Sequence, residues 1–382
     1  MPRSLQRLRR FLGTLVASMA TLAAFATVAA EPAPPDGHGP GWAEAKQIIA
    51  NARRIVTPGG IERQQKLRIG GIEQWVSIRS VDRRNPVLLV IHGGPGYVLN
   101  PMSWWSARGW EEYFTVVQWD QRGAGKTWLI DDQKAVAPTL TRERMVADAE
   151  EMTQWARKEF GQQRIFVLGH SWGSFLGLQL AVRHPEWLHA YIGVGQLADG
   201  PEGERRGWRF ALDAAQRAGN ADAVRELESL APYGTDSQPI PLQHIFTQRK
   251  WLARFGGVMA WRQDNDADSD LSKLSPDYSD DELRRIWDGN EASEPALLPG
   301  LLALDLTSIR QLAVPLILFE GRYDINVNAD VAAQWFDSVR SPSKRLVWFE
   351  HSGHMPMTEE PGKFLVSLAT IVLPLAHGPD GR

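Results

Sequence analysis

The sequence contains no cysteine in its 382 residues. Disulfide bonds, thiolate catalysis and cysteine-ligated metals are therefore excluded. A strong charge bias is also absent, because 42 Lys and Arg stand against 45 Asp and Glu, a net charge of −3. Without a basic field the chain has no electrostatic reason to bind nucleic acid, and we expect no such partner. The length instead allows a large core with an insertion.

The first 30 residues have the pattern of a secretory signal peptide. The segment holds four arginines and no acid, and Phe11–Ala30 is apolar, rich in alanine and closed by small residues. Cleavage before Glu31 would leave 38 of the 42 basic residues against 45 acidic ones, a net charge of −7. We therefore expect an exported protein, periplasmic or secreted. The alternative is an uncleaved anchor, since about 20 apolar residues can span a bilayer, and only then is a membrane a partner.

Strands and helices are expected to alternate after an N-terminal extension or linker, residues 31–65, whose first part is rich in Pro and Gly. Lys66–Ser80 is typical of a β-hairpin. Continuous apolar runs, typical of strands buried on both faces, are Pro86–His92, Tyr113–Trp119, Arg164–Leu168, Ala190–Val194, Pro315–Phe319 and Arg345–Phe349. Apolar residues spaced three and four apart over Met145–Phe160 predict a helix among them. The alternation predicts an α/β fold with a mostly parallel sheet flanked by helices.

One region breaks this alternation. Residues 198–300 contain no convincing buried strand; Trp208–Ala218 and Ala221–Ala231 have helical patterns, and Asp264–Asp270 is a polar run. About 100 such residues between two sheet strands predict an inserted helical cap. The cap divides the core into residues 66–197 and 301–375.

A nucleophile motif follows one of the buried strands. Gly169–Gly173 reads Gly-His-Ser-Trp-Gly, and the helical run Phe175–Val182 comes directly after it. The chemistry needs a sharp strand-to-helix turn that holds the hydroxyl above the sheet, and the glycines leave room where the chain doubles back. The alternative is a serine in a plain Gly-rich turn. The flanking strand and helix favour Ser171 as the nucleophile.

A serine hydroxyl needs a base, and the base needs an acid. His354 lies just past the last apolar strand, where a loop can carry it over the sheet, and His351 is the second choice. Asp324 follows the strand before it, at the same end of the sheet as Ser171, with Glu320 as an alternative acid still inside the strand. The chain order Ser171, Asp324, His354 is the order expected for α/β hydrolases.

A Gly-rich turn follows the first buried strand. His92–Gly96 reads His-Gly-Gly-Pro-Gly, and its backbone can bring an N–H close to a substrate carbonyl. Together with the N–H of Trp172 it would form a two-donor oxyanion hole, with either Gly93 or Gly94 as the second donor. The alternative is a plain turn.

Five motifs together resemble the prolyl iminopeptidase-like serine peptidases of the α/β-hydrolase fold. They fall in the same order, from about residue 65 to 370: His92–Gly96, Asp120–Gly123, Gly169–Ser174, Gly321–Asp324 and Gly353–His354. The resemblance implies an α/β-hydrolase core, a helical cap and a Ser-Asp-His triad, with no metal and no organic cofactor.

The cap departs from the pattern of these peptidases. Their cap carries acids that hold the free amine of the substrate, with a Trp-x-x-Trp-Glu stretch. The nearest stretch here, Trp251–Trp261, has no Glu. Other cap acids include Glu202, Glu204, Glu226 and Glu228, and none of them can be matched to the role from sequence. The resemblance therefore supports hydrolysis more firmly than proline specificity.

Three functions compete. The first is a serine aminopeptidase of prolyl iminopeptidase type, acting on small peptides or amides through an acyl-enzyme. The second is an esterase or lipase-like hydrolase of apolar esters, which 16 tryptophans favour mildly. The third, a non-catalytic binding protein, is disfavoured by the complete triad. The expected partner is a small-molecule or short-peptide substrate.

Overall fold

The computed structural model describes residues 40–235, 239–264 and 266–377. The chain divides into two compact units, residues 1–43 and 44–382, and the second contains the whole sheet. The signal peptide expected over residues 1–30 lies outside the described residues. Within those residues, no helix has both the length and the apolar character that a membrane crossing requires.

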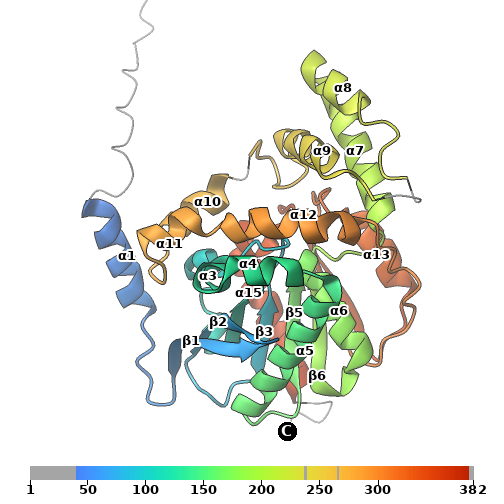
Figure 1. Cartoon of the computed structure of the whole chain (residues 1–382). Helices are drawn as coiled ribbons and strands as arrows, with labels where there is room; N and C mark the ends of the chain where they lie inside the picture. The colour runs from blue at the N-terminus through green and yellow to red at the C-terminus, as the bar shows by residue number, and fades with distance from the viewer. Residues whose placement is uncertain (1–39, 236–238, 265, 378–382) are drawn as a thin grey trace, which may run out of the picture. The chain divides into compact units, whose positions relative to one another are not determined.

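A single eight-stranded sheet forms the centre of this unit (Figure 1), in the order β1-β2-β4-β3-β5-β6-β7-β8. The strands are β1 Ile61–Ile69, β2 Ile72–Ser80, β3 Val87–Ile91, β4 Thr115–Asp120, β5 Ile165–His170, β6 Leu188–Val194, β7 Leu316–Gly321 and β8 Lys344–Phe349. β1, β2 and β4 pair antiparallel, and every other pairing is parallel. The predicted mostly parallel sheet is confirmed, and β3, β4, β5 and β7 are buried along their whole length, as their apolar runs indicated.

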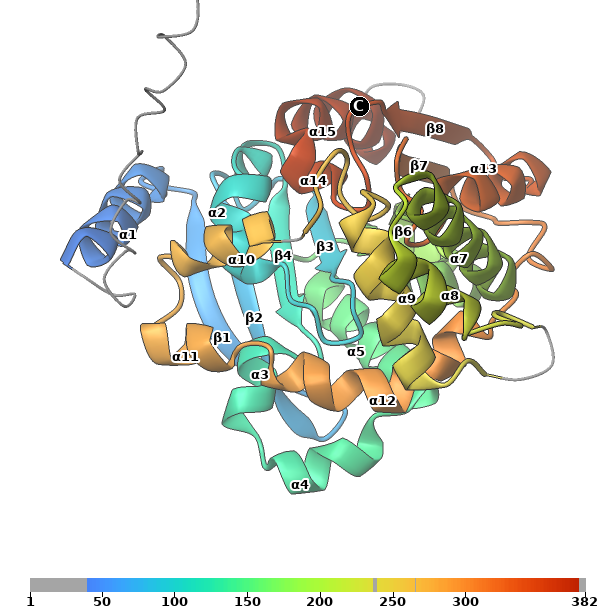
Figure 2. The same cartoon turned by 90° about the horizontal axis from the view of Figure 1, so that it is seen from above.

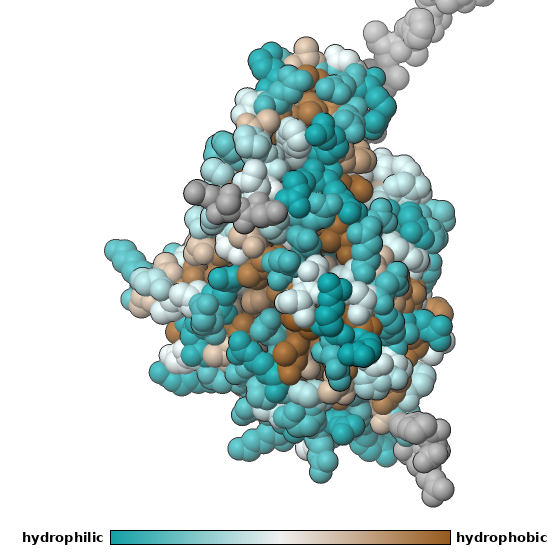
Figure 3. All heavy atoms as spheres, turned by 90° about the vertical axis from the view of Figure 1, so that its right-hand side faces the viewer, coloured by the Kyte–Doolittle hydropathy of each residue, from teal (hydrophilic) through white to brown (hydrophobic). Residues whose placement is uncertain are grey.

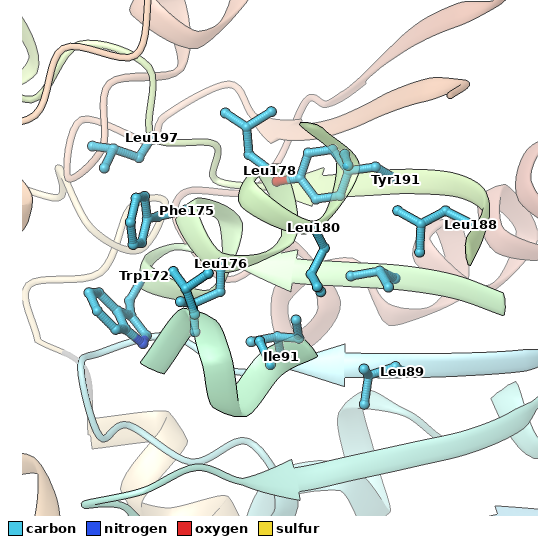
Figure 4. Close-up of a cluster of buried hydrophobic side chains, with 14 of the residues drawn as sticks. Leu89, Ile91, Trp172, Phe175, Leu176, Leu178, Leu180, Leu188, Tyr191 and Leu197 are labelled. Carbon is cyan, nitrogen blue, oxygen red and sulfur yellow. The ribbon is translucent and has the colours of Figure 1, made fainter. Parts of the chain in front are cut away.

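Helices cover both faces of the sheet. The helices of the core are α2 Ser103–Ser106, α3 Gly125–Ile130, α4 Gln133–Val136, α5 Arg142–Glu159, α6 Trp172–Arg183, α13 Ala329–Ser338, α14 Pro356–Glu359 and α15 Pro361–Ser367. The close-up in Figure 4 shows Leu178 of α6 beside Tyr191 of β6, and Leu176 of the same helix and Ile91 of β3 belong to the same buried cluster. Burial of such side chains stabilises each by about 1.5–3 kcal/mol. The α6 helix that follows the nucleophile motif is therefore fixed firmly to the sheet.

The segment before the sheet is more regular than expected. Residues 31–65 were expected to be an extension or linker, but α1 covers Pro40–Arg53 and β1 begins at Ile61. β1 pairs with β2 along its whole length, from Ile61 opposite Ser80 to Ile69 opposite Ile72. The hairpin is therefore five residues longer at its start than the apolar pattern indicated, because an edge strand needs only one buried face and tolerates polar residues.

Helices fill the region between β6 and β7. They are α7 Gly200–Arg217, α8 Ala221–Glu228, α9 Leu242–Arg254, α10 Asp266–Lys273, α11 Asp280–Arg285 and α12 Asp288–Leu302. In the view from above, α9, α10 and α12 lie over the sheet (Figure 2). We call α7 to α12 and their connections the cap. The polar run Asp264–Asp270 is thus partly helical, since α10 begins at Asp266.

The surface of the cap and core mixes polar and apolar residues. On the face shown in Figure 3, hydrophobic residues form small brown areas separated by hydrophilic ones. Scattered apolar residues of this kind are normal on a protein surface.

Candidate active site

Ser171 occupies a strained turn between β5 and α6. Its φ of 54° and ψ of −118° place a non-glycine residue at positive φ, which persists only where the surroundings enforce it. A Cβ added to Gly169 would lie 2.3 Å from the carbonyl oxygen of Gly173, and one added to Gly173 would lie 2.1 Å from that of Ile91. Both flanking glycines are therefore required by close backbone approach, the geometry that the motif predicted.

Asp324 and His354 meet at the same end of the sheet. The Nδ1 atom of His354 lies 2.7 Å from Oδ2 of Asp324, and the two residues are only 7% and 1% exposed. Asp324 follows β7 and His354 follows β8, and because these two strands are parallel neighbours, the two residues lie side by side. The backbone N–H of Val327 donates to the other carboxylate oxygen of Asp324, at 3.1 Å. The carboxylate is thereby held in place to orient the imidazole.

Ser171 and His354 line one cavity of about 340 Å³ between the core and the cap. Among the described residues no hydrogen bond joins the hydroxyl of Ser171 to the ring of His354; such contacts commonly tighten only when substrate binds. The cavity is also lined by residues of α9, α10 and α12, including Ile245, Asp268 and Leu298. Its size is within the range of small-molecule sites.

The two alternative triad candidates lie elsewhere. His351 is exposed, its ring centroid is 5.7 Å from that of Trp261, and it does not line the cavity. Glu320 is fully buried in β7, where its Oε1 accepts the backbone N–H of Gln196 at 3.0 Å. Burial, reinforced by the negative charge of Asp324, raises the pKa of Glu320 well above its ordinary value. The geometry therefore favours Asp324 and His354 over both alternatives.

The expected oxyanion donors surround Ser171. Trp172 and Gly94 line the cavity, and no other described residue accepts a hydrogen bond from either backbone N–H. Gly93 lies beside the nucleophile, since an added Cβ would be 3.1 Å from the Cβ of Ser171. The side chain of Gln121 ties the two segments together: it accepts from the indole N–H of Trp172 at 2.9 Å and donates to the carbonyl of His92 at 2.9 Å. We did not identify this role of Gln121 from sequence, although it lies within a motif of the resemblance.

His170, next to the nucleophile, contacts the proposed base. Its Nε2 lies 2.9 Å from the carbonyl oxygen of His354, and the two ring centroids are 4.8 Å apart. Burial is the main reason that the pKa of His170 falls to about 3, and the neighbouring His354 lowers it further. A neutral His170 with its proton on Nε2 donates to His354 and adds no positive charge beneath the imidazole.

The four cap acids considered from sequence do not line the cavity. Glu202 pairs with arginines of its own helix, and Glu226 pairs with Lys250. Glu228 is exposed. Glu204 is 2% exposed, but its carboxylate forms an ion pair with Arg249 and accepts a hydrogen bond from the hydroxyl of Tyr233.

Two other cap acids do line the cavity, Asp268 of α10 and Glu294 of α12. Asp268 is 2% exposed; its Oδ2 accepts the hydroxyl of Tyr97 at 3.3 Å, and its Oδ1 has no hydrogen-bond partner among the described residues. Burial raises the pKa of Asp268 to about 6, and it also raises the pKa of Glu294. Sequence reasoning missed both residues, because neither lies in a motif.

The cavity changes character along α12. Asn290, Glu294, Leu298 and Leu301, spaced by four, four and three residues, all line it and so share one face of the helix. The polar half contacts the Gly-rich turn, since the side-chain amide of Asn290 donates to the carbonyl of Pro95 at 2.5 Å. The second half is aliphatic. A ligand along this helix would therefore meet polar groups at one end and an apolar wall at the other.

No group of His, Asp and Glu residues in the described part of the chain has the arrangement of a metal site.

A profile of the alpha/beta hydrolase fold matches residues 86–361. The chain belongs to this family, and it is a hydrolase.

Within this family, the chain is similar to proteins named as aminopeptidases and proline iminopeptidases. The chain is 27% identical over 308 residues to a probable aminopeptidase, YbaC, of Bacillus subtilis, covering 80% of this chain and 94% of that protein. It is 25% identical over 304 residues to a proline iminopeptidase of Saccharolobus solfataricus, covering 78% and 88%. The solved proline iminopeptidase of Mycobacterium smegmatis superposes with a TM-score of 0.57 at 18% identity, over 81% and 97% of the chains, which supports the fold alone. The resemblance to the prolyl iminopeptidase-like family is confirmed.

Proposed function

We propose that the protein is a serine aminopeptidase that removes the N-terminal residue from small peptides or amides. The proposal depends above all on the shared cavity, which Ser171, the Asp324-bound His354 and Asp268 all line; one oxygen of Asp268, Oδ1, has no hydrogen-bond partner among the described residues. The first two provide nucleophile and base. The third provides a group that distinguishes a free amine from a blocked one.

The reaction proceeds through an acyl-enzyme. His354 takes the proton of Ser171 as its hydroxyl oxygen attacks the substrate carbonyl, and Asp324 stabilises the imidazolium that forms. The backbone N–H of Trp172, with that of Gly94 or Gly93, donates to the oxyanion. His354 then protonates the leaving amine, the C–N bond breaks, and water releases the acyl group by the reverse route.

Asp268 is the proposed partner of the substrate ammonium. A buried cation needs a paired carboxylate, because an unpaired buried charge costs several kcal/mol. Oδ1 of Asp268, which has no hydrogen-bond partner in the described part of the chain, is such a partner, and Glu294 of α12 is a second carboxylate of the same cavity. The ammonium also favours the ionised form of Asp268, which burial alone disfavours.

A matched pair of substrates tests the proposal. Leucine p-nitroanilide and its N-acetylated form differ only in the amine, and proline and alanine p-nitroanilides extend the comparison to side-chain preference. A buried charge pair that is truncated costs about 2–5 kcal/mol, so the free amine should be cleaved roughly 30- to 5,000-fold faster in kcat/KM. A ratio near one would discard the aminopeptidase function while leaving the hydrolase intact.

An esterase of apolar acyl groups is the second candidate. The observation in its favour is the aliphatic half of the cavity, where Leu298, Leu301 and Ile245 form an apolar wall. An esterase with this site would cleave p-nitrophenyl esters as fast as, or faster than, the free-amine anilide. The acetylated anilide would then lose nothing relative to its free form.

We further propose, from the sequence of residues 1–30, that the protein is exported and processed near Glu31. Mass spectrometry of the native protein should give an N-terminus near Glu31 outside the cytoplasm. Intact residues 1–30 on a soluble cytoplasmic protein would refute the proposal.

A further inference from the structure

The carboxylate of Glu359, at the end of α14, joins two loops that meet at the proposed base. Its Oε2 accepts the backbone N–H groups of Gly353 and Met355, at 2.9 and 3.2 Å, on either side of His354. Its Oε1 accepts the backbone N–H of Ala260, at 2.7 Å, from the cap. Three donors from two separate segments therefore converge on a single side chain.

The cap segment concerned, Gly257–Ala260, also contacts both triad loops directly. The backbone N–H of His354 donates to the carbonyl of Val258 at 2.6 Å, and that of Ile325, next to the triad acid, donates to the carbonyl of Gly257 at 2.9 Å. The approach is close enough that a Cβ on Gly353 would lie 2.2 Å from the carbonyl oxygen of Val258. The segment is thus bonded to the loops of both the base and the acid.

The same segment forms part of the cavity wall. Val258 and Met259 line the cavity, and both are buried, at 9% and 2% exposed. A substrate that fills the cavity presses on a wall whose backbone is hydrogen-bonded to His354. A substrate with a very small acyl group leaves most of this wall untouched.

We propose that Glu359 is a positioning residue that couples the occupied cap wall to the orientation of His354. The inference rests on the proposed role of Ser171 and His354, but not on the choice between peptidase and esterase. When a large acyl group packs against Val258 and Met259, Glu359 and the Val258 carbonyl transmit the fixed position of the wall to the base. Large substrates therefore gain turnover, whereas an acetyl group gains little.

Glu359→Gln breaks this link selectively. A glutamine offers one acceptor oxygen where the carboxylate offers two, and its NH2 group only donates and cannot accept from a backbone N–H. The arrangement that keeps most bonds turns the oxygen to Gly353 and Met355, so the bond to Ala260 is the one lost. A hydrogen bond to a charged group contributes about 1.5–3 kcal/mol, which is roughly a 10- to 150-fold change.

The experiment compares two esters that differ only in acyl size, p-nitrophenyl acetate and p-nitrophenyl hexanoate. In Glu359→Gln, kcat for the hexanoate should fall about 10- to 150-fold, with kcat for the acetate changed less than about threefold. Glu359→Asp keeps both acceptor oxygens and should recover part of the loss. Glu360→Gln is the matched control. One oxygen of Glu360 accepts from the backbone N–H of His351 and the hydroxyl of Ser352, and no hydrogen bond joins its side chain to the described residues of the cap, so both esters should be unaffected.

Equal losses on both esters, or no loss on either, would overturn the coupling. The melting temperatures of all variants show whether a loss of activity arises from misfolding. Failure of the proposed role of Ser171 gives a different result, since Ser171→Ala would then leave both ester activities intact.

Discussion

The core and the cap place their functional groups by different means. Each proposed catalytic residue of the core follows a strand of the sheet by a few residues, and the parallel pairing of β5, β6, β7 and β8 brings these strand ends together. In the cap, the acids that line the cavity come from α10 and α12, which no sheet aligns. Their positions depend on how short helices pack over the core.

The electrostatic state of the two regions differs as well. Asp324 is held by His354 and a backbone N–H, whereas Asp268 keeps an oxygen without a partner in a buried position. A satisfied carboxylate orients its neighbour. An unsatisfied one is costly until a ligand supplies the missing partner. We infer that core substitutions alter turnover of every substrate, and cap substitutions alter the choice among substrates.

The largest effect should come from Ser171→Ala, since it removes the nucleophile. Turnover should fall on the order of 10⁶-fold for every substrate, as for a comparable serine. A fluorophosphonate probe should label one residue of the wild-type protein and none of this variant. Labelling that persists in the folded variant would place the nucleophile elsewhere and end the comparison between core and cap.

Asp324→Asn should have the next largest effect, with a loss of roughly 10⁴ in turnover, because the imidazole loses both its orientation and its counter-charge.

His354→Ala should likewise remove nearly all turnover. His351→Ala is the control, since this exposed ring lies beside Trp261, and it should keep most activity on the same substrate. The reverse outcome for the two histidines would reassign the base.

The core could be predicted from sequence because its signals are local. Apolar runs such as Val87–Ile91 predict strands buried on both faces. The same prediction is wrong for Arg345–Phe349, because β8 is an edge strand and only its last residue, Phe349, is buried. A serine, an aspartate and a histidine just past three parallel strands nevertheless lie at one edge of the sheet. Gly169 and Gly173 predict the sharp turn at Ser171, because the close backbone approach there leaves no room for a Cβ. Even Gln121 lies inside a motif, but its role becomes visible only in the folded structure, where its side chain contacts both loops.

The cap could be predicted only as a helical insertion. Glu204 and Asp268 are both acids in helices, and sequence does not show that the first is neutralised by Arg249 while the second faces the cavity. That difference arises from contacts more than 40 residues apart in the chain. Helical periodicity identifies a buried face, but not the element against which it is buried.

Asp268→Asn should separate cap from core more sharply than any other single change. It removes the charge while keeping the size, so kcat/KM for leucine p-nitroanilide should fall about 30- to 5,000-fold. The acetylated anilide, which has no ammonium, should change only a few fold. Glu202→Gln serves as the control, because helical surface pairs such as those with Arg205 and Arg206 contribute little. Equal losses on the free and acetylated substrates would show that Asp268 supports the cavity without reading the amine.

The smallest effect is expected in the pH dependence of that preference. Burial raises the pKa of Asp268 from 3.8 to about 6, while the groups that act on it in the opposite sense are the Tyr97 hydroxyl, Arg262 and His354. The folded protein therefore holds a proton that the unfolded chain releases between about pH 4 and 6. Its contribution to stability is complete below about pH 4 and is lost as the pH rises through about 6.

The carboxylate that binds an ammonium is present in the opposite range, above about pH 6. The ratio of kcat/KM for the free and acetylated anilides should then fall about tenfold between pH 7 and pH 5, as for loss of one ionised group. Taking the ratio cancels any pH dependence of the catalytic steps that the two substrates share, since both require the same base. The ratio should be flat in Asp268→Asn. A wild-type ratio that is equally flat over this range, in a protein that still prefers the free amine, would move recognition from Asp268 to a group that stays ionised, and Glu294→Gln would be the variant to measure next.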